Sequence, residues 1–286
     1  MHTTLRITGM YKDILIPLTN TATDDALLSF AIELAEEQEA HLSALVTVAL
    51  TIPVGFEMVA IPTDVYSPIH DAERANGAQL AQKARDRLKS ASISSEVRAV
   101  ESLMEPSTNV AVLHARYADL SIVVGGADRS GPASGLFADL LMGSGRPVLV
   151  IPPKPADGST RNHVVVAWQP TREATRAVHD ALPLLQAAAQ VDVIVVDPRV
   201  DDGHHGQEPG ADIAIHLARH GVRANVVTIP SMGATVEQSI LRFAVEAGAG
   251  LIVAGGYSHS RLREQVLGGV TRGLFERAGI PVLFSH

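Results

Sequence analysis

The residues best suited to chemistry lie near the end of the chain, in the segment AGGYSHSRLREQVLGGVTR at positions 254–272. It contains two glycine pairs, Gly255-Gly256 and Gly268-Gly269. Glycine at the end of a strand lets the backbone approach a ligand closely, and the unpaired N–H groups at the start of a helix favour an anion such as phosphate. The segment therefore indicates a phosphate-bearing ligand, although a tight turn or close helix packing explains the same glycines.

Motifs of committed enzymes are missing from the chain. It contains no GxxxxGK[S/T], GxGxxG, GxSxG or HExxH sequence. It also contains no cysteine, which excludes disulfides, zinc–thiolate sites and a cysteine nucleophile. His204 and His205 lie in an acidic loop without the spacing of metal ligands on a rigid element, so we expect no metal site. We expect a protein without enzymatic activity, while a catalytic triad assembled in space stays open.

The pattern of the whole chain indicates an α/β framework for this segment. The chain has 286 residues, of which 46% are apolar and 19% charged, as in globular proteins with two domains. In the second half, strands are predicted at residues 164–168, 191–196, 222–229, 251–254 and 281–284, with helices at 173–186, 211–220, 235–247 and 267–278. This alternation predicts a doubly wound parallel sheet. The first half follows the same order, with its second helix at 71–88 after a long loop at 51–68.

The two halves of the chain repeat each other. ILIP at 14–17 corresponds to VVVA at 164–167, IVVGG at 122–126 to IVAGG at 252–256, and PVLV at 147–150 to PVLF at 281–284. A repeat of this length indicates a duplicated domain, and the Pro- and Gly-rich stretch between the halves indicates a linker. We predict a first domain at residues 1–152, a linker at 153–161 and a second domain at 162–286.

These features resemble a tandem universal stress protein, which holds two copies of the UspA-like fold in one polypeptide. The resemblance covers nearly the whole chain and rests on the βαβαβαβαβ order, on VVVAWQPTRE at 164–173, and on the GGYSHSRLRE, GGVT and PVL sequences near the end. It implies two tandem Rossmann-like domains of the adenine nucleotide alpha hydrolase type, packed as a pseudo-dimer. It also implies a regulatory or ligand-binding role in the stress response and possible self-association.

The ATP-binding members of that family share a glycine motif and an Asp after the first strand that holds the ribose. In this chain Gly255 matches the first glycine, Ser258 stands at the second, and Gly268 matches the third. Gln169 stands in place of the Asp. The resemblance implies ATP or another adenine nucleotide in the second domain, with Mg²⁺ only alongside ATP. The implied binding residues are Ala167, Trp168, Gln169, Val196, Gly255, Ser258, Gly268, Gly269, Val270 and Thr271.

The first domain departs further from the family's pattern. Gly125 is kept, but Asp128 replaces the second glycine and Thr19 occupies the position of the ribose-binding Asp. A carboxylate where phosphate should lie repels it. We expect no nucleotide in the first domain.

Charge and hydropathy limit the other partners. The net charge of −8 disfavours nucleic acid. No long apolar run suggests a membrane span or a signal peptide, so we expect a cytoplasmic protein. Two other functions stay open. The first is a nucleotide-free adaptor or scaffold that acts through protein contacts. The second is a slow ATP hydrolase.

Overall fold

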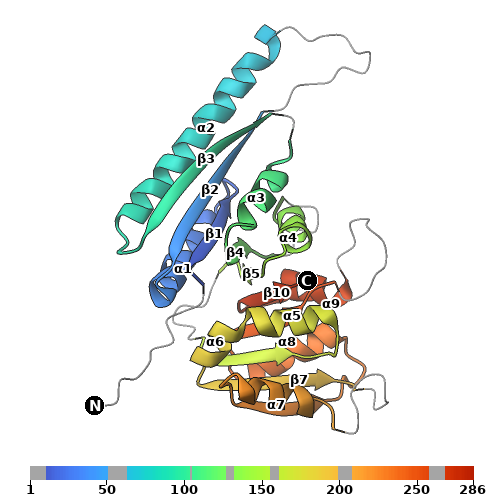
Figure 1. Cartoon of the computed structure of the whole chain (residues 1–286). Coiled ribbons are helices and arrows are strands. Elements are labelled where there is room, and N and C mark those ends of the chain that lie inside the picture. The colour runs from blue at the N-terminus through green and yellow to red at the C-terminus, as the bar shows by residue number, and fades with distance from the viewer. Residues whose placement is uncertain are drawn as a thin grey trace, which may run out of the picture. The chain divides into compact units, whose positions relative to one another are not determined.

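The computed structural model in Figure 1 describes residues 11–50, 63–103, 105–126, 132–154, 161–198, 208–257 and 268–286. Contacts divide the chain into two compact units, Met1–Ile122 and Val123–His286. The division lies inside strand β4 (Leu120–Val124), whereas the sequence boundary was placed at the linker 153–161. Residues 155–160 of that linker lie outside the described part of the chain. The domain boundary at the linker stays a prediction.

The first unit is a parallel sheet with alternating strands and helices. Its strands lie in the order β3-β2-β1-β4. The further strands are β1 (Asp13–Leu18), β2 (His41–Leu50) and β3 (Ser95–Leu103). The helices are α1 (Asp24–Gln38), α2 (Thr63–Lys89) and α3 (Ser107–Ala115). Strands β1 and β2 are rich in buried aliphatic residues, which suits a sheet covered on both faces.

Helix α2 is longer than the sequence predicted. Residues 63–68 belong to the helix, so the expected loop to residue 68 and helix start at 71 were wrong. Pro68 lies inside the helix, where it removes only one hydrogen bond near the start of 27 residues. The helix runs along β2 and β3 (Figure 1). Gly77 lies so close to Val48 of β2 that an added methyl group would overlap it.

The second unit is also an α/β sheet, with the strand order β5-β10-β9-β6-β7-β8. The strands are β5 (Val148–Ile151), β6 (His163–Ala167), β7 (Gln190–Val196), β8 (Ala224–Ile229), β9 (Leu251–Gly255) and β10 (Val282–Ser285). The helices are α4 (Pro132–Gly143), α5 (Arg172–Asp180), α6 (Leu182–Ala187), α7 (Ala211–Arg219), α8 (Val236–Glu246) and α9 (Gly269–Arg277). Strands β6 to β10 are parallel. The predicted doubly wound fold is therefore confirmed.

One predicted helix of this unit is divided. The segment 173–186 was expected to form a single helix, but α5 ends at Asp180 and α6 begins at Leu182. Pro183 lies in the first turn of α6 and has no N–H to continue the hydrogen bonds of α5. The break leaves the apolar side chains of both helices buried.

Residues from the first sequence repeat complete the core of the second unit. Strand β5 pairs antiparallel with β10, and these are the final strands of the two repeats. An antiparallel pair of equivalent strands is what a two-fold relation between repeats produces. The ring of Phe137 in α4 stacks on Phe275, with centroids 4.7 Å apart, and lies 5.2 Å from the ring of Phe284.

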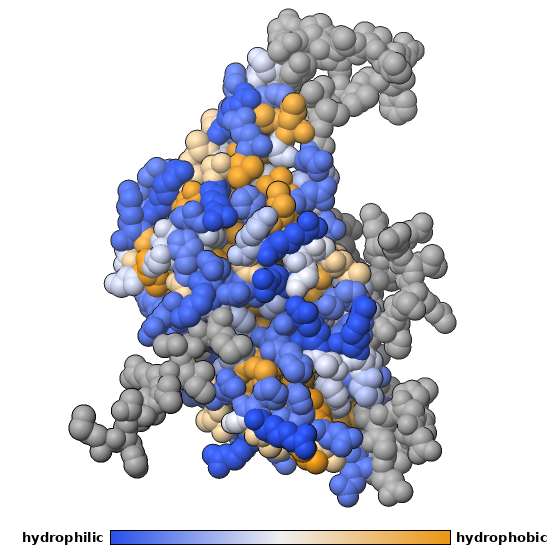
Figure 2. All heavy atoms as spheres, in the orientation of Figure 1, coloured by the Kyte–Doolittle hydropathy of each residue, from blue (hydrophilic) through white to orange (hydrophobic). Residues whose placement is uncertain are grey.

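Hydrophilic residues predominate on the face shown in Figure 2, with apolar residues scattered among them. Among the described residues, the most exposed large apolar side chains are Tyr117 at 78% and Met232 at 83%. None of the helices in the described ranges has the length and hydropathy needed to span a bilayer.

Candidate functional site

The order of the strands changes direction between β6 and β9 in the second unit. From β6 the chain proceeds to β7 and β8 on one side, whereas β9 and β10 lie on the other. Ala167 at the end of β6 pairs with Ala254 on one side and with Ile194 on the other. The carboxyl ends of these strands therefore align at one edge, where ligands of doubly wound sheets bind.

The predicted binding residues fall into two groups at this edge. The residues at the strand ends are Ala167, Trp168, Gln169, Val196 and Gly255. The residues at the start of α9 are Gly268, Gly269, Val270 and Thr271. Ser258 lies outside the described residues, as do His204 and His205. Trp168 is half-buried and Gln169 is exposed.

One hydrogen bond joins the two groups. The backbone N–H of Tyr257 donates to Oγ1 of Thr271 at 3.1 Å. Thr271 is only 3% exposed, so its hydroxyl holds the turn after β9 against the first turn of α9. Tyr257 itself has φ of 60°, a left-handed conformation that is uncommon for a residue with a side chain. The start of α9 thus lies beside the end of β9.

The glycines at the end of β9 are required by packing. A Cβ on Gly255 would lie 2.6 Å from the backbone nitrogen of Ala174 in α5. A Cβ on Gly256 would lie 2.7 Å from Cδ2 of Leu141 in α4. A tight strand–helix connection accounts for this pair without a ligand.

The glycines at the start of α9 have no such explanation. A Cβ on Gly268 or on Gly269 would meet no atom of the described residues within 4 Å, so no packing contact among those residues requires this pair. Gly268 is the N-cap of α9 and supplies no capping side chain. The first N–H groups of a helix have no partner within the helix. In α9 these groups lie beside the end of β9, which Thr271 contacts through Tyr257.

Two residues that the sequence analysis did not single out, His286 and Arg172, lie near Tyr257 in the turn after β9. His286 follows β10, and its Nδ1–H donates to the carbonyl oxygen of Gly256 at 3.1 Å. Its ring lies edge-on to that of Tyr257, with centroids 6.2 Å apart. Nη2 of Arg172 is 3.5 Å from Nε2 of His286, which places a guanidinium group near the turn. These residues are far apart in the chain, and no motif connects them.

Burial sets the ionisation of Tyr257. Removal from water, helped by the negative charge of Asp139 in α4, raises the pKa of its hydroxyl to about 12. The phenol is therefore neutral at physiological pH, so Tyr257 adds no negative charge to the turn near Arg172.

In the first unit, the loop after β1 corresponds to the loop after β6 and is held by a carboxylate of the chain itself. Asp24, the first residue of α1, is 6% exposed and accepts hydrogen bonds from the backbone N–H groups of Thr19 at 3.3 Å and Asn20 at 2.8 Å. Asp24 thus bonds the loop in which a ribose-binding residue was sought. Asp128 lies outside the described residues.

No group of three or more His, Cys, Asp or Glu side chains within the described ranges is arranged to hold a metal ion.

Comparison with known proteins shows the fold. No family model and no curated protein matches the chain. The structure of a universal stress protein from Archaeoglobus fulgidus aligns with 95% of this chain and 95% of its own, at 15% identity and a TM-score of 0.73. A Pseudomonas aeruginosa protein of unknown function aligns over 96% of this chain and 92% of its own, at 16% identity and a TM-score of 0.55. The chain has the fold of the universal stress proteins, as its sequence indicated.

A half-length protein also aligns, a universal stress protein from Archaeoglobus fulgidus in complex with dAMP. It covers 49% of this chain and 97% of its own, at 13% identity and a TM-score of 0.35. This similarity is too low to place its ligand on the chain.

Proposed function

We propose that the chain is a universal stress protein with a regulatory role, and that its second repeat binds ATP or another adenine nucleotide. The observation that carries the proposal is the start of α9. Among the described residues, no atom lies within 4 Å of a Cβ placed on Gly268 or Gly269, and Thr271 is bonded to the turn after β9. The phosphates bind the first N–H groups of α9, because a helix start without side chains receives an anion.

The remaining residues at the edge suit the rest of a nucleotide. The exposed amide of Gln169 hydrogen-bonds the ribose without the charge of an Asp. The half-buried ring of Trp168 at the end of β6 is available to stack on the base. Arg172 adds positive charge near the turn. Any Mg²⁺ enters with the triphosphate.

The chain supplies its own probe of binding, since Trp168 is its single tryptophan. Titration with MgATP, with excitation of Trp168, is expected to give a saturable change in emission. The test variant is Gly268→Glu, which places a carboxylate and its bulk at the phosphate position. Because a Cβ there meets nothing within 4 Å, the variant should fold normally. We expect its affinity to fall by about a hundredfold or more.

Gly279→Glu is the matched control. Gly279 follows the other end of α9, and a Cβ there also meets no atom within 4 Å. The control adds the same charge and should bind ATP like the wild type. Absence of saturable binding below about 1 mM would leave the nucleotide-free adaptor as the function of the chain. Equal binding by wild type and Gly268→Glu would place the nucleotide elsewhere.

A further inference from the structure

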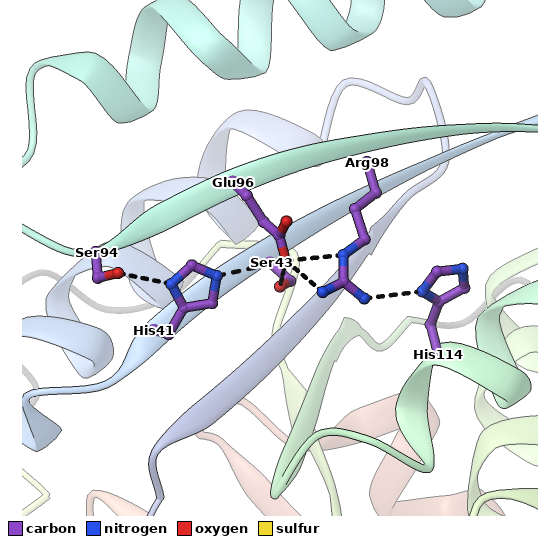
Figure 3. A network of polar contacts seen from close by, with 6 residues as sticks. All are labelled: His41, Ser43, Ser94, Glu96, Arg98 and His114. Atoms are coloured by element: carbon purple, nitrogen blue, oxygen red, sulfur yellow. Dashed lines mark hydrogen bonds and ion pairs between the residues drawn. The ribbon is translucent and has the colours of Figure 1, made fainter.

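A polar network in the first unit joins residues of β2 and β3 to His114 of α3 (Figure 3). Its centre is the carboxylate of Glu96 in β3. Nε of Arg98 donates to this carboxylate at 2.7 Å, and Oγ of Ser43 in β2 donates at 2.8 Å. Nε2 of His41 lies 3.4 Å from the same oxygen, and Nδ1 of His41 bonds Ser94 at 2.7 Å. These contacts lower the pKa of Glu96 to about 2, chiefly through Arg98.

The network reaches α3 through one contact. Nη1 of Arg98 donates to Nδ1 of His114 in the last turn of α3 at 3.1 Å. A guanidinium group can only donate, so Nδ1 of His114 must accept and carries no proton. The ring is therefore neutral when the contact forms. Burial and the charge of Arg98 both lower the pKa of His114, and the charge of Glu96 opposes them.

Helix α3 buries few side chains completely. Its buried side chains are Ala111 and Ala115, which remove little apolar surface from water, while Val110 and Val112 are half-buried. Leu113 is 52% exposed and Tyr117, just beyond the helix, is 78% exposed. The contact between Arg98 and His114 therefore adds to a modest apolar packing of this nine-residue helix on the sheet.

The second repeat has the opposite arrangement at the matching positions. By strand register, Asp192 corresponds to Ser43 and Asn225 to Glu96. Nε2 of His163 lies 2.7 Å from Oδ2 of Asp192, and its Nδ1 lies 3.0 Å from the carbonyl oxygen of Ala247. Both partners of His163 are acceptors, whereas Arg98, the partner of His114, is a donor, so a proton on Nδ1 of His114 abolishes the contact with Arg98.

We propose that the contact between Arg98 and His114 is a proton-sensitive attachment, which holds α3 on the sheet at neutral pH and releases it in mild acid. When Nδ1 of His114 is protonated, two donors face each other and two positive charges lie side by side. The charged groups of β3 that face His114 are Arg98 and Glu96, and His41 of β2 approaches Glu96 as well. The carboxylate of Glu96 is already bonded to Arg98 and Ser43.

The direction of the pH effect follows from proton binding. The pKa of His114 is lower in the folded chain than its ordinary value of 6.5, so the unfolded or released state takes up the proton first. The attachment is complete above that ordinary value and weakens as the pH falls below it. Below the pKa that His114 has in the folded chain, the attachment of α3 weakens no further.

Hydrogen exchange of the whole chain, followed by mass spectrometry at about pH 7.5 and about pH 5.5, tests the proposal. After correction for intrinsic rates, we expect protection of residues 107–115 to fall by up to about tenfold in the wild type. Residues 236–246 of α8, which His163 supports through Ala247, should keep their protection in the same sample. In His114→Asn the amide oxygen replaces Nδ1 as an acceptor that does not titrate, and α3 should keep its protection at both pH values.

The proposal is overturned if wild type and His114→Asn lose the same protection, or if the wild type loses none. A second measurement does not depend on the fold of that variant. The ring of His114, followed by NMR, should titrate below the ordinary histidine value, and its midpoint should rise in Arg98→Gln. An unchanged midpoint in Arg98→Gln would also overturn the proposal.

Discussion

Replacement of Asp192 by Asn should destabilise the second unit more than any surface substitution of the same kind. Asp192 is 3% exposed. Its carboxylate accepts hydrogen bonds from Nε2 of His163 at 2.7 Å, from Nε2 of Gln190 at 3.1 Å and from Nδ2 of Asn225 at 3.1 Å. An amide offers one acceptor oxygen, so its NH₂ group must face a donor.

The expected loss follows from these contacts. A buried polar group left without its hydrogen-bond partner lowers the free energy of unfolding by about 1–3 kcal/mol. We expect about 2 kcal/mol, because Asp192 is buried while the His163 side chain keeps 14% exposure. Urea unfolding followed by Trp168 emission, which reports on the second unit, measures this loss.

Asp212→Asn is the control for this prediction. Asp212 is exposed in the first turn of α7, where loss of its charge changes stability by about 0.3–1 kcal/mol. In a double-mutant cycle, His163→Gln should cost much less in the Asp192→Asn background than in the wild type. Equal losses in Asp192→Asn and Asp212→Asn would refute the account of this network.

Three further substitutions test the packing and the first network. Phe137→Ala should lower the stability of the second unit by about 3–5 kcal/mol in the same urea experiment, since it removes a ring packed on Phe275 and Phe284. Gly255→Ala should cost about 1–3 kcal/mol because its methyl overlaps the backbone of α5, while Gly279→Ala should change stability by less than about 0.5 kcal/mol. Glu96→Gln should lower the free energy of unfolding by about 1 kcal/mol at neutral pH, after allowance for solvent screening. The difference in denaturant midpoint between this variant and the wild type should shrink as the pH falls from 4.5 toward 2. In that range the Glu96 carboxylate, whose pKa is lowered in the folded chain, takes up a proton. A pH-independent cost would contradict the last prediction.

The alternation of strands and helices and the positions of the second-half strands could be predicted because most of these strands are short apolar runs between helical segments. Element ends were less predictable. Pro68 lies inside α2, and the helix continues through it. Pro183 lies in the first turn of α6, directly after the break between α5 and α6. Proline removes one hydrogen bond in either place, and the surrounding packing decides the outcome.

The nucleotide-binding residues stay a prediction. The glycines at the start of α9 could be singled out from their spacing, but the contacts of Gly255 and Thr271 depend on other elements. The network of Glu96 was missed for the same reason. Ser43 and Glu96 lie in two different strands, and only the register between β2 and β3 brings them together.

Photolabelling with 8-azido-ATP tests the central claim most directly, because it reports where an adenine nucleotide lies on the intact chain. After irradiation and digestion, mass spectrometry identifies the labelled peptides, with and without excess unlabelled ATP. We predict label in the second repeat, on peptides that contain Trp168, Val196 or residues 255–271, and loss of that label when ATP competes. Label on residues 13–124, or label that ATP does not displace, would contradict it.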